Sequence, residues 1–161
     1  MQIHTLKTVQ TLGCSLDEAW DFISSPANLK MITPEYMGFE ITSEFNREKM
    51  FSGMIVRYNV RPVFGLPIRW VTEITHVEEP YYFVDEQRFG PYKFWHHKHF
   101  LRETADGVEM TDVVHYALPF GPFGAMVHPI LVRPKLEDIF RYRRKILAKI
   151  FPFEKATPVP A

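Results

Sequence analysis

The chain has 161 residues, 46% of them hydrophobic and 24% charged, which is the composition of one globular domain. Nineteen basic residues balance nineteen acidic ones, which argues against a nucleic-acid partner, because such proteins carry a basic excess. A single cysteine, Cys14, excludes an internal disulfide framework and a multi-cysteine metal site. With no apolar run long enough for a membrane span and no signal-peptide pattern, we expect a cytoplasmic protein without a stable membrane anchor.

The first third of the chain predicts one strand and two short helices. Residues 2–12 alternate with a period of two and are rich in threonine, which indicates a strand. Ser15 and Glu18 form a capping-box pattern at the start of a helix, and Pro26 ends that helix, because the residue before proline avoids helical geometry. Residues 26–37 are apolar but bounded by prolines, and we expect a second short helix or turn there.

Strands dominate the middle of the chain. Turn-forming residues, mostly glycine, proline, asparagine and aspartate, separate six apolar or alternating segments. Consecutive strands with short links form an antiparallel meander. The predicted strands are 39–45, 54–61, 68–78, 81–88, 94–103 and 108–118.

The apolar period changes to 3.6 residues after the last of these strands. This predicts a long helix over about 134–151, preceded by a helical piece at 123–132. Pro129 and Pro134 should kink the two pieces or divide them.

The element order predicts an α+β domain over residues 1–151, followed by a loose, proline-rich tail at 152–161. A curved seven-stranded antiparallel sheet has one apolar face, and the long C-terminal helix must cover it. A sheet that grips a single helix leaves space between them, which suits a small-molecule pocket.

Several local motifs carry a family resemblance. The segments Ser15–Trp20 and Asp21–Leu29 follow the first strand, and later matches are Trp70–Ile74, Phe83–Gln87, Gly90–Pro91, Trp95–Phe100, Met110–Asp112 and Pro119–Gly121. Together they resemble a bacterial branch of the helix-grip superfamily of START domains, birch-pollen allergens and polyketide cyclases (SRPBCC), over about residues 2–151. The resemblance implies a START-like fold. It leaves transport, cyclase, coenzyme-Q-binding and regulatory roles open, because one scaffold carries them all.

Period-two alternation assigns side chains to the pocket face of the predicted sheet. In 94–101, Lys98 should face water, so the residues that alternate with it point inward. In 81–88, the inward set is the one that avoids burying both Glu86 and Arg88. The predicted inward residues are Tyr81, Phe83, Asp85, Gln87, Trp95, His97, His99, Leu101, Met110, Asp112, Val114, Tyr116 and Leu118.

Short turns between these strands predict which inward residues lie opposite one another, within side-chain hydrogen-bonding reach. A register error of one residue would destroy the pairing. The predicted pairs are Asp85–His97, His99–Asp112 and Trp95–Tyr116.

This inward His–Asp cluster has four interpretations. It is a polar patch that ties strands together, a site for a ligand's polar head, an acid–base pair, or a metal site. As an acid–base pair, His97 or His99 would be the base, oriented by Asp85 or Asp112. The His-x-His spacing suits a metal, but the sequence shows no clear third and fourth ligand, so we predict no metal and no cofactor.

The aromatic residues and the C-terminal helix also have two interpretations each. Aromatic side chains either fill the core or line a pocket for a flat or polyisoprenoid ligand. The basic residues Arg141, Arg144, Lys145 and Lys149 are a solvated helix face, or they make transient contact with an anionic membrane. Arg143 falls on the apolar stripe and should reach the mouth of the cavity or extend past it.

The leading hypothesis is that the protein binds or carries a small lipophilic molecule. An enzyme of the cyclase or dehydratase kind, with the His–Asp cluster as its acid–base pair, is the alternative, and a protein-interaction module is a third. Enzymatic activity therefore stays open. The predicted ligand-binding residues are Trp70, Phe83, Asp85, Gln87, Trp95, His97, His99, Met110, Asp112, Tyr116, Phe140 and Arg143.

Overall fold

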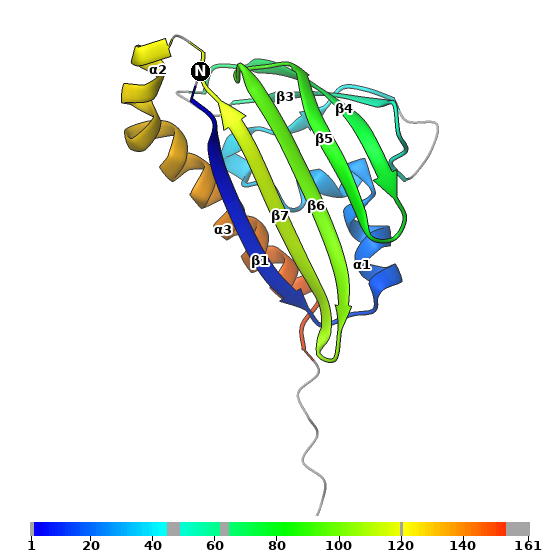
Figure 1. Cartoon of the computed structure of the whole chain (residues 1–161). Coiled ribbons are helices and arrows are strands. Elements are labelled where there is room, and N and C mark those ends of the chain that lie inside the picture. The colour runs from blue at the N-terminus through cyan, green and yellow to red at the C-terminus, as the bar shows by residue number, and fades with distance from the viewer. Residues whose placement is uncertain (1, 45–48, 62–64, 120, 154–161) are drawn as a thin grey trace, which may run out of the picture.

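A computed structural model describes residues 2–44, 49–61, 65–119 and 121–153. Its main feature is the predicted seven-stranded antiparallel sheet, whose strands lie in the order β1-β7-β6-β5-β4-β3-β2. The sheet curves around one long helix (Figure 1). The strands are β1 (His4–Leu12), β2 (Glu40–Ile41), β3 (Met54–Val60), β4 (Ile68–Glu78), β5 (Tyr82–Phe89), β6 (Phe94–Thr104) and β7 (Gly107–Ala117).

Helix α1 (Leu16–Ile23) begins with the predicted capping box. The Glu18 backbone N–H donates to Ser15 Oγ, and the Ser15 N–H donates to the Glu18 carboxylate at 2.8 Å. Ala19, Trp20 and Ile23 form the buried face of this helix. The predicted start and end of α1 are both confirmed.

The segment after α1 forms two 3₁₀ turns, η1 (Pro26–Lys30) and η2 (Glu35–Met37). Strand β2 is shorter than the predicted 39–45, of which residue 45 lies outside the described residues. A side chain replaces part of the ladder, because the Arg57 N–H donates to Ser43 Oγ at 3.0 Å rather than to a backbone carbonyl. The regular pairing of β2 with β3 therefore ends early.

The C-terminal helical region runs through α2 (Gly121–Val127), the π-helical turn η3 (His128–Val132) and α3 (Arg133–Ile150). The prolines change the helix type and do not interrupt the helical run. Pro129 lies at the start of η3 and Pro134 at the start of α3, so each proline stands where one helix type changes to the next. Of the predicted tail at 152–161, residues 154–161 lie outside the described part of the chain.

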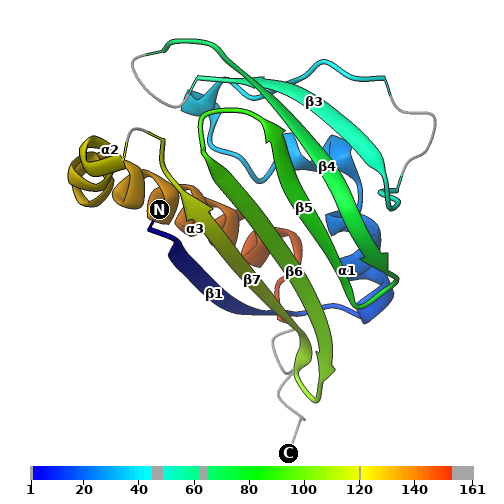
Figure 2. The same cartoon turned by 45° about the horizontal axis from the view of Figure 1, so that its top comes forward.

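Helix α3 lies along the concave face of the sheet (Figure 2). Two groups of buried residues pack around it. One contains Trp20, Ile74 and Leu147, and the other contains Tyr116 and Phe140. Within the described residues, no helix has the length and apolar character needed to cross a membrane.

The strand register confirms all three predicted pairs, Asp85–His97, His99–Asp112 and Trp95–Tyr116. The predicted inward face also holds along β6 and β7, whose inward residues are mostly buried. Tyr81 is the exception. It precedes β5 in a turn, where its N–H donates to the Glu78 carbonyl, and its side chain is exposed.

Candidate functional site

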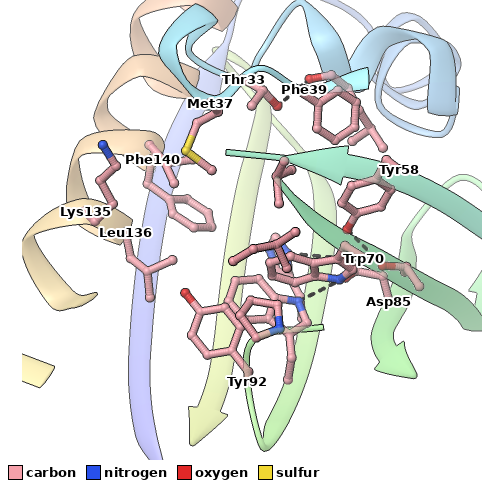
Figure 3. A pocket seen from close by; sticks show the side chains of 18 of the residues that line it. Thr33, Met37, Phe39, Tyr58, Trp70, Asp85, Tyr92, Lys135, Leu136 and Phe140 are labelled. Carbon is pink, nitrogen blue, oxygen red and sulfur yellow. Dashed lines mark hydrogen bonds and ion pairs between the residues drawn. The ribbon is translucent and has the colours of Figure 1, made fainter. Parts of the chain in front are cut away.

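A cavity of about 420 Å³ lies between the concave face of the sheet and the C-terminal helical region. Most of its wall is apolar or aromatic. Figure 3 shows Phe140 and Leu136 of α3 on one side and Tyr58 and Trp70 of the sheet on the other. Polar groups from β4, β5 and β6 interrupt the apolar wall on the sheet side.

Eight of the twelve predicted ligand-binding residues line this cavity. Four do not, and each of those has another place in the fold. The lining residues are Trp70, Phe83, Asp85, Trp95, His97, His99, Phe140 and Arg143, and the others are Gln87, Met110, Asp112 and Tyr116.

Local partners account for these four residues. The Gln87 side chain donates to the Tyr92 carbonyl at 2.7 Å, and Met110 packs in the core beneath the site. The Tyr116 hydroxyl lies 2.8 Å from His128 Nε2. Asp112 lies behind the cavity wall and touches residues that do line it. Inward orientation on a strand therefore does not by itself place a side chain at the cavity.

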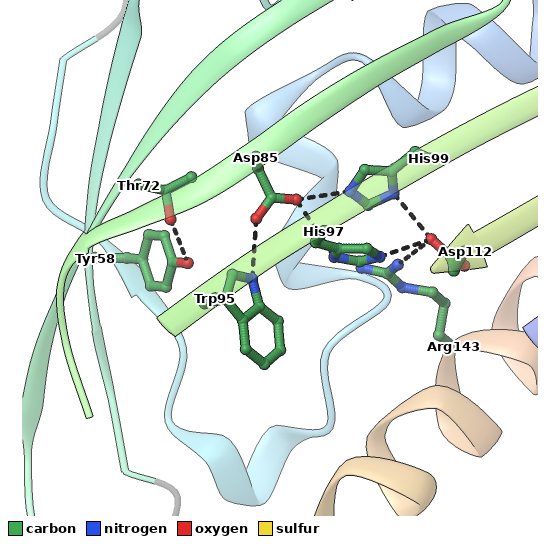
Figure 4. Close-up of polar contacts among 8 residues, drawn as sticks. All are labelled: Tyr58, Thr72, Asp85, Trp95, His97, His99, Asp112 and Arg143. Atoms are coloured by element: carbon green, nitrogen blue, oxygen red, sulfur yellow. Dashed lines mark hydrogen bonds and ion pairs between the residues drawn. The ribbon is translucent and has the colours of Figure 1, made fainter. Parts of the chain in front are cut away.

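Two histidines and two aspartates form a closed cluster on the cavity wall (Figure 4). His99 Nε2 lies 2.7 Å and His97 Nδ1 3.3 Å from Asp85 Oδ2. On the other side, His97 Nε2 and His99 Nδ1 each lie 2.9 Å from Asp112 Oδ1. Each imidazole thus bridges the two carboxylates, and the two rings overlap with centroids 3.7 Å apart.

Two further side chains bind the carboxylates of the cluster from outside. The Trp95 indole N–H donates to Asp85 Oδ1 at 3.2 Å, and the Arg143 guanidinium donates to Asp112 Oδ1 at 3.2 Å. Arg143 comes from α3, so it ties the helix to the sheet across the edge of the cavity. Of the two placements considered for Arg143, at the mouth of the cavity or past it, the structure has the first, because Arg143 lines the cavity.

Burial and the charges of neighbouring groups set the protonation states of the cluster. Burial and the neighbouring His99 lower the pKa of His97 to about 4, so His97 is neutral near pH 7. Burial also opposes charge on His99, but the two carboxylates outweigh it and raise the pKa of that ring. For Asp112, burial is outweighed by Arg143 and the histidines, which hold its pKa well below the usual range.

Several residues that line the cavity were not among the predicted ligand-binding residues, including Thr72, Tyr92 and Leu136. Strand alternation could have identified Thr72, because it shares a strand face with Trp70. In the structure, the hydroxyl groups of Thr72 and Tyr58 form a hydrogen bond of 2.9 Å. Tyr92 lies in the turn between β5 and β6, where strand alternation carries no signal.

Three side chains of the cluster offer atoms that could together hold a metal ion. These are Asp85, His97 and His99, whose ligand atoms lie within 4.8 Å of one another. The sequence pattern had supplied the two histidines but assigned no third ligand. The structure places Asp85 in that position.

No protein-family model and no curated protein matches the sequence. Solved structures do share its fold. A START superfamily protein from Mycobacterium smegmatis is 14% identical, with a TM-score of 0.67, and the match covers 91% of this chain and 99% of that one. Ara h 8.0201 is 16% identical, with a TM-score of 0.59 and coverage of 92% and 99%.

A third structure, of a Rhodobacter sphaeroides protein, is 18% identical, with a TM-score of 0.63 and coverage of 92% and 99%. All three matches extend over nearly the whole of both chains, so they compare complete folds. Identities this low carry the fold and not the function. The chain therefore has the START-like helix-grip fold that its sequence motifs resembled.

Proposed function

We propose that the protein binds a small lipophilic molecule in the cavity beneath α3. The observation that supports this most strongly is the cavity itself, about 420 Å³ with a mainly apolar and aromatic wall. Its volume falls within the range of roughly 300–1,000 Å³ that is typical of small-molecule sites. Proteins with this fold commonly bind hydrophobic ligands, which agrees with the proposal.

The cavity combines an apolar wall with polar groups, of which Asp85, His97 and His99 lie on the sheet side and Arg143 on α3, so an amphipathic ligand fits it best. Its polar group lies against His97, His99 and Asp85, and its apolar body contacts Trp70 and Phe140. The Asp85 carboxylate keeps lone pairs beyond those that Trp95 and His99 occupy, so a ligand hydroxyl can donate to it, whereas a purely apolar molecule would only displace its water. That difference favours an oxygen-bearing ligand.

A matched pair of tryptophan variants tests this proposal. Leu136 lines the cavity, whereas Ile130 is 77% exposed and does not. We expect Leu136→Trp to fill the cavity and weaken binding of the amphipathic probe 8-anilinonaphthalene-1-sulfonate at least tenfold. Ile130→Trp adds the same side chain outside the cavity and should change affinity less than twofold. Fluorescence titration of each folded protein measures both.

A second cavity-filling variant, Ile139→Trp, guards against a folding defect specific to position 136. Circular dichroism and a thermal melt establish that each variant is folded before titration. Equal probe affinity in wild type, Leu136→Trp and Ile139→Trp would refute the proposal, because the probe would then bind elsewhere. Native mass spectrometry of freshly purified protein identifies any natural ligand.

The His–Asp cluster supports one alternative, an enzyme that uses His99 as an acid–base group. The observation that favours it is the 2.7 Å contact between His99 and Asp85 on the cavity wall, since a carboxylate orients an imidazole for proton transfer. Once a ligand is identified, His99→Asn should retain binding but abolish its turnover. Unchanged turnover would discard this role.

A further inference from the structure

His97 and Asp85 lie in close contact without a hydrogen bond between them. A neutral histidine has one N–H, and Asp112 accepts it from His97 Nε2 at 2.9 Å. His97 Nδ1 then carries a lone pair and lies 3.3 Å from Asp85 Oδ2, and the carboxylate offers only electron pairs. A positive ion at this point would turn a repulsive contact into an attractive one.

His99 presents its other nitrogen to the same oxygen. Its Nε2 lies 2.7 Å from Asp85 Oδ2, where a proton now holds the pair together. Its Nδ1 is buried and has no hydrogen bond, although it lies 2.9 Å from Asp112 Oδ1. A proton placed on Nδ1 would lie close to Asp112, without hydrogen-bond geometry as the ring now stands, and would free Nε2 to bind a metal. The cluster therefore offers two imidazole nitrogens and one carboxylate oxygen within 4.8 Å of one another.

We propose that Asp85, His97 and His99 bind a divalent transition metal ion of the zinc class. Tetrahedral zinc ligands at 2.0–2.2 Å from the ion lie about 3.4 Å apart. The His97–Asp85 separation of 3.3 Å already matches, and the His99–Asp85 contact opens by about 0.7 Å on this basis. Two histidines and a carboxylate are a donor set that zinc accepts.

Other side chains already contact the three metal-binding residues from the side away from the ion. Metal-bound histidines usually donate their second N–H to a carboxylate, which fixes the ring and its tautomer. Asp112 does this for His97 and lies 2.9 Å from Nδ1 of His99, where a small rotation of the ring would complete the second bond. The Trp95 N–H fixes the Asp85 carboxylate through its other oxygen. A polar patch that merely joined strands would not need this division into inner and outer groups.

The three metal ligands lie on the cavity wall, so a bound ion would contact a molecule in the cavity. Asp85, His97 and His99 all line the cavity, whereas Asp112 does not. Three protein ligands leave a fourth position open, and that position faces the space where a small molecule would lie. The ion would bind an oxygen of that molecule or a water. Arg143, by neutralising Asp112, leaves the Asp85 charge for the ion.

Zinc and cobalt titrations of the full chain test this site. We expect one Zn²⁺ per chain by isothermal titration calorimetry after removal of metals with a chelator. Co²⁺ should give the intense visible absorption of a site with low coordination number. His97→Asn and Asp85→Asn should abolish this absorption, and Asp112→Asn should weaken affinity by about 10–100-fold, as loss of an outer partner does.

A neighbouring histidine provides the control. His96 lies on the same strand but on the opposite face, 3.7 Å from Glu86. His96→Asn should change Zn²⁺ affinity less than twofold, and circular dichroism establishes that every variant is folded. Metal binding that depends on His96 and not on His97 would overturn the proposal, as would no binding by the folded wild type. The titration uses no lipophilic ligand, so the metal site and the ligand proposal can fail separately.

Discussion

At the scale of single residues, the charged side chains of the His–Asp cluster stabilise one another, and removal of one leaves its partner buried and unpaired. Asp112 is 4% exposed and remains ionised because Arg143 and the two histidines surround it. Burial of an unpaired carboxylate is costly, so each partner stabilises the others. The cluster should therefore respond to substitution as a unit.

Removal of the Arg143 cation should destabilise the fold strongly. Arg143→Met leaves Asp112 buried without its cation, and loss of one member of a buried pair costs about 3–5 kcal/mol. The exposed Arg141 pairs with Asp138 at 3.6 Å, and Arg141→Met should cost less than about 1 kcal/mol. Urea unfolding in the presence of a chelator measures both, and equal losses would contradict the account.

The same cluster sets a direction for acid sensitivity. A carboxyl whose pKa is lowered by folding contributes stability above its unfolded pKa, about 3.9 for aspartate, and loses it as pH falls below that value. Without Arg143, the pKa of Asp112 rises and protonation begins at higher pH. We expect the acid-unfolding midpoint of Arg143→Met to lie above that of wild type, as followed by circular dichroism. A midpoint at or below that of wild type would refute this.

Cys14 should be a poorly reactive thiol. Burial and the nearby Glu18 raise the pKa of Cys14 to about 11 from an ordinary value of 9.0. A pKa that is higher by about two units leaves about 100-fold less thiolate near neutral pH, and the thiolate is the reactive form. Iodoacetamide should therefore label the native protein at least 100-fold more slowly than the urea-unfolded chain. Equal rates would contradict this, and Cys14 is the only thiol.

At the scale of elements, local signals decided most boundaries. The capping box at Ser15 fixes the start of α1 without help from distant residues. Strand β2 shows the opposite case, because the Ser43 side chain takes over a backbone hydrogen bond and the ladder ends early. A local pattern cannot reveal such a competition between side chain and backbone.

The capping box yields a prediction for α1. Ser15→Ala removes the acceptor for the Glu18 N–H, which should cost about 1 kcal/mol of unfolding free energy. The control, Ser52→Ala, changes an exposed serine just before β3 and should cost less than about 0.5 kcal/mol. Urea denaturation distinguishes the two, and identical values would show that the cap contributes nothing.

The His–Asp cluster shows what period-two alternation along the strands can predict and what it cannot. Period two and short turns were enough to pair Asp85 with His97 and His99 with Asp112 across three strands. They were not enough to show that the shortest contact is diagonal, from His99 to Asp85. Side-chain torsions decide that, and the sequence does not encode them locally.

At the scale of the whole molecule, the position of α3 determines what the sheet can enclose. Leu147 packs in the core, whereas Phe140 and Leu136, earlier in the helix, face the cavity. One helix therefore closes the core at one end and forms the cavity wall at the other. The sequence predicted the helix and its stripe but not this separation, which depends on how the curved sheet meets the helix.

The most direct test of the account is methyl NMR of the protein titrated with 8-anilinonaphthalene-1-sulfonate. Methyl signals of Leu136 and Ile74, which line the cavity, should shift and saturate together at one probe per chain. Signals of Leu12 and Leu147, which are buried in the core and do not line the cavity, should stay in place. Shifts confined to surface methyls, or no saturable shift at the cavity, would contradict the central claim that the cavity binds a small lipophilic molecule.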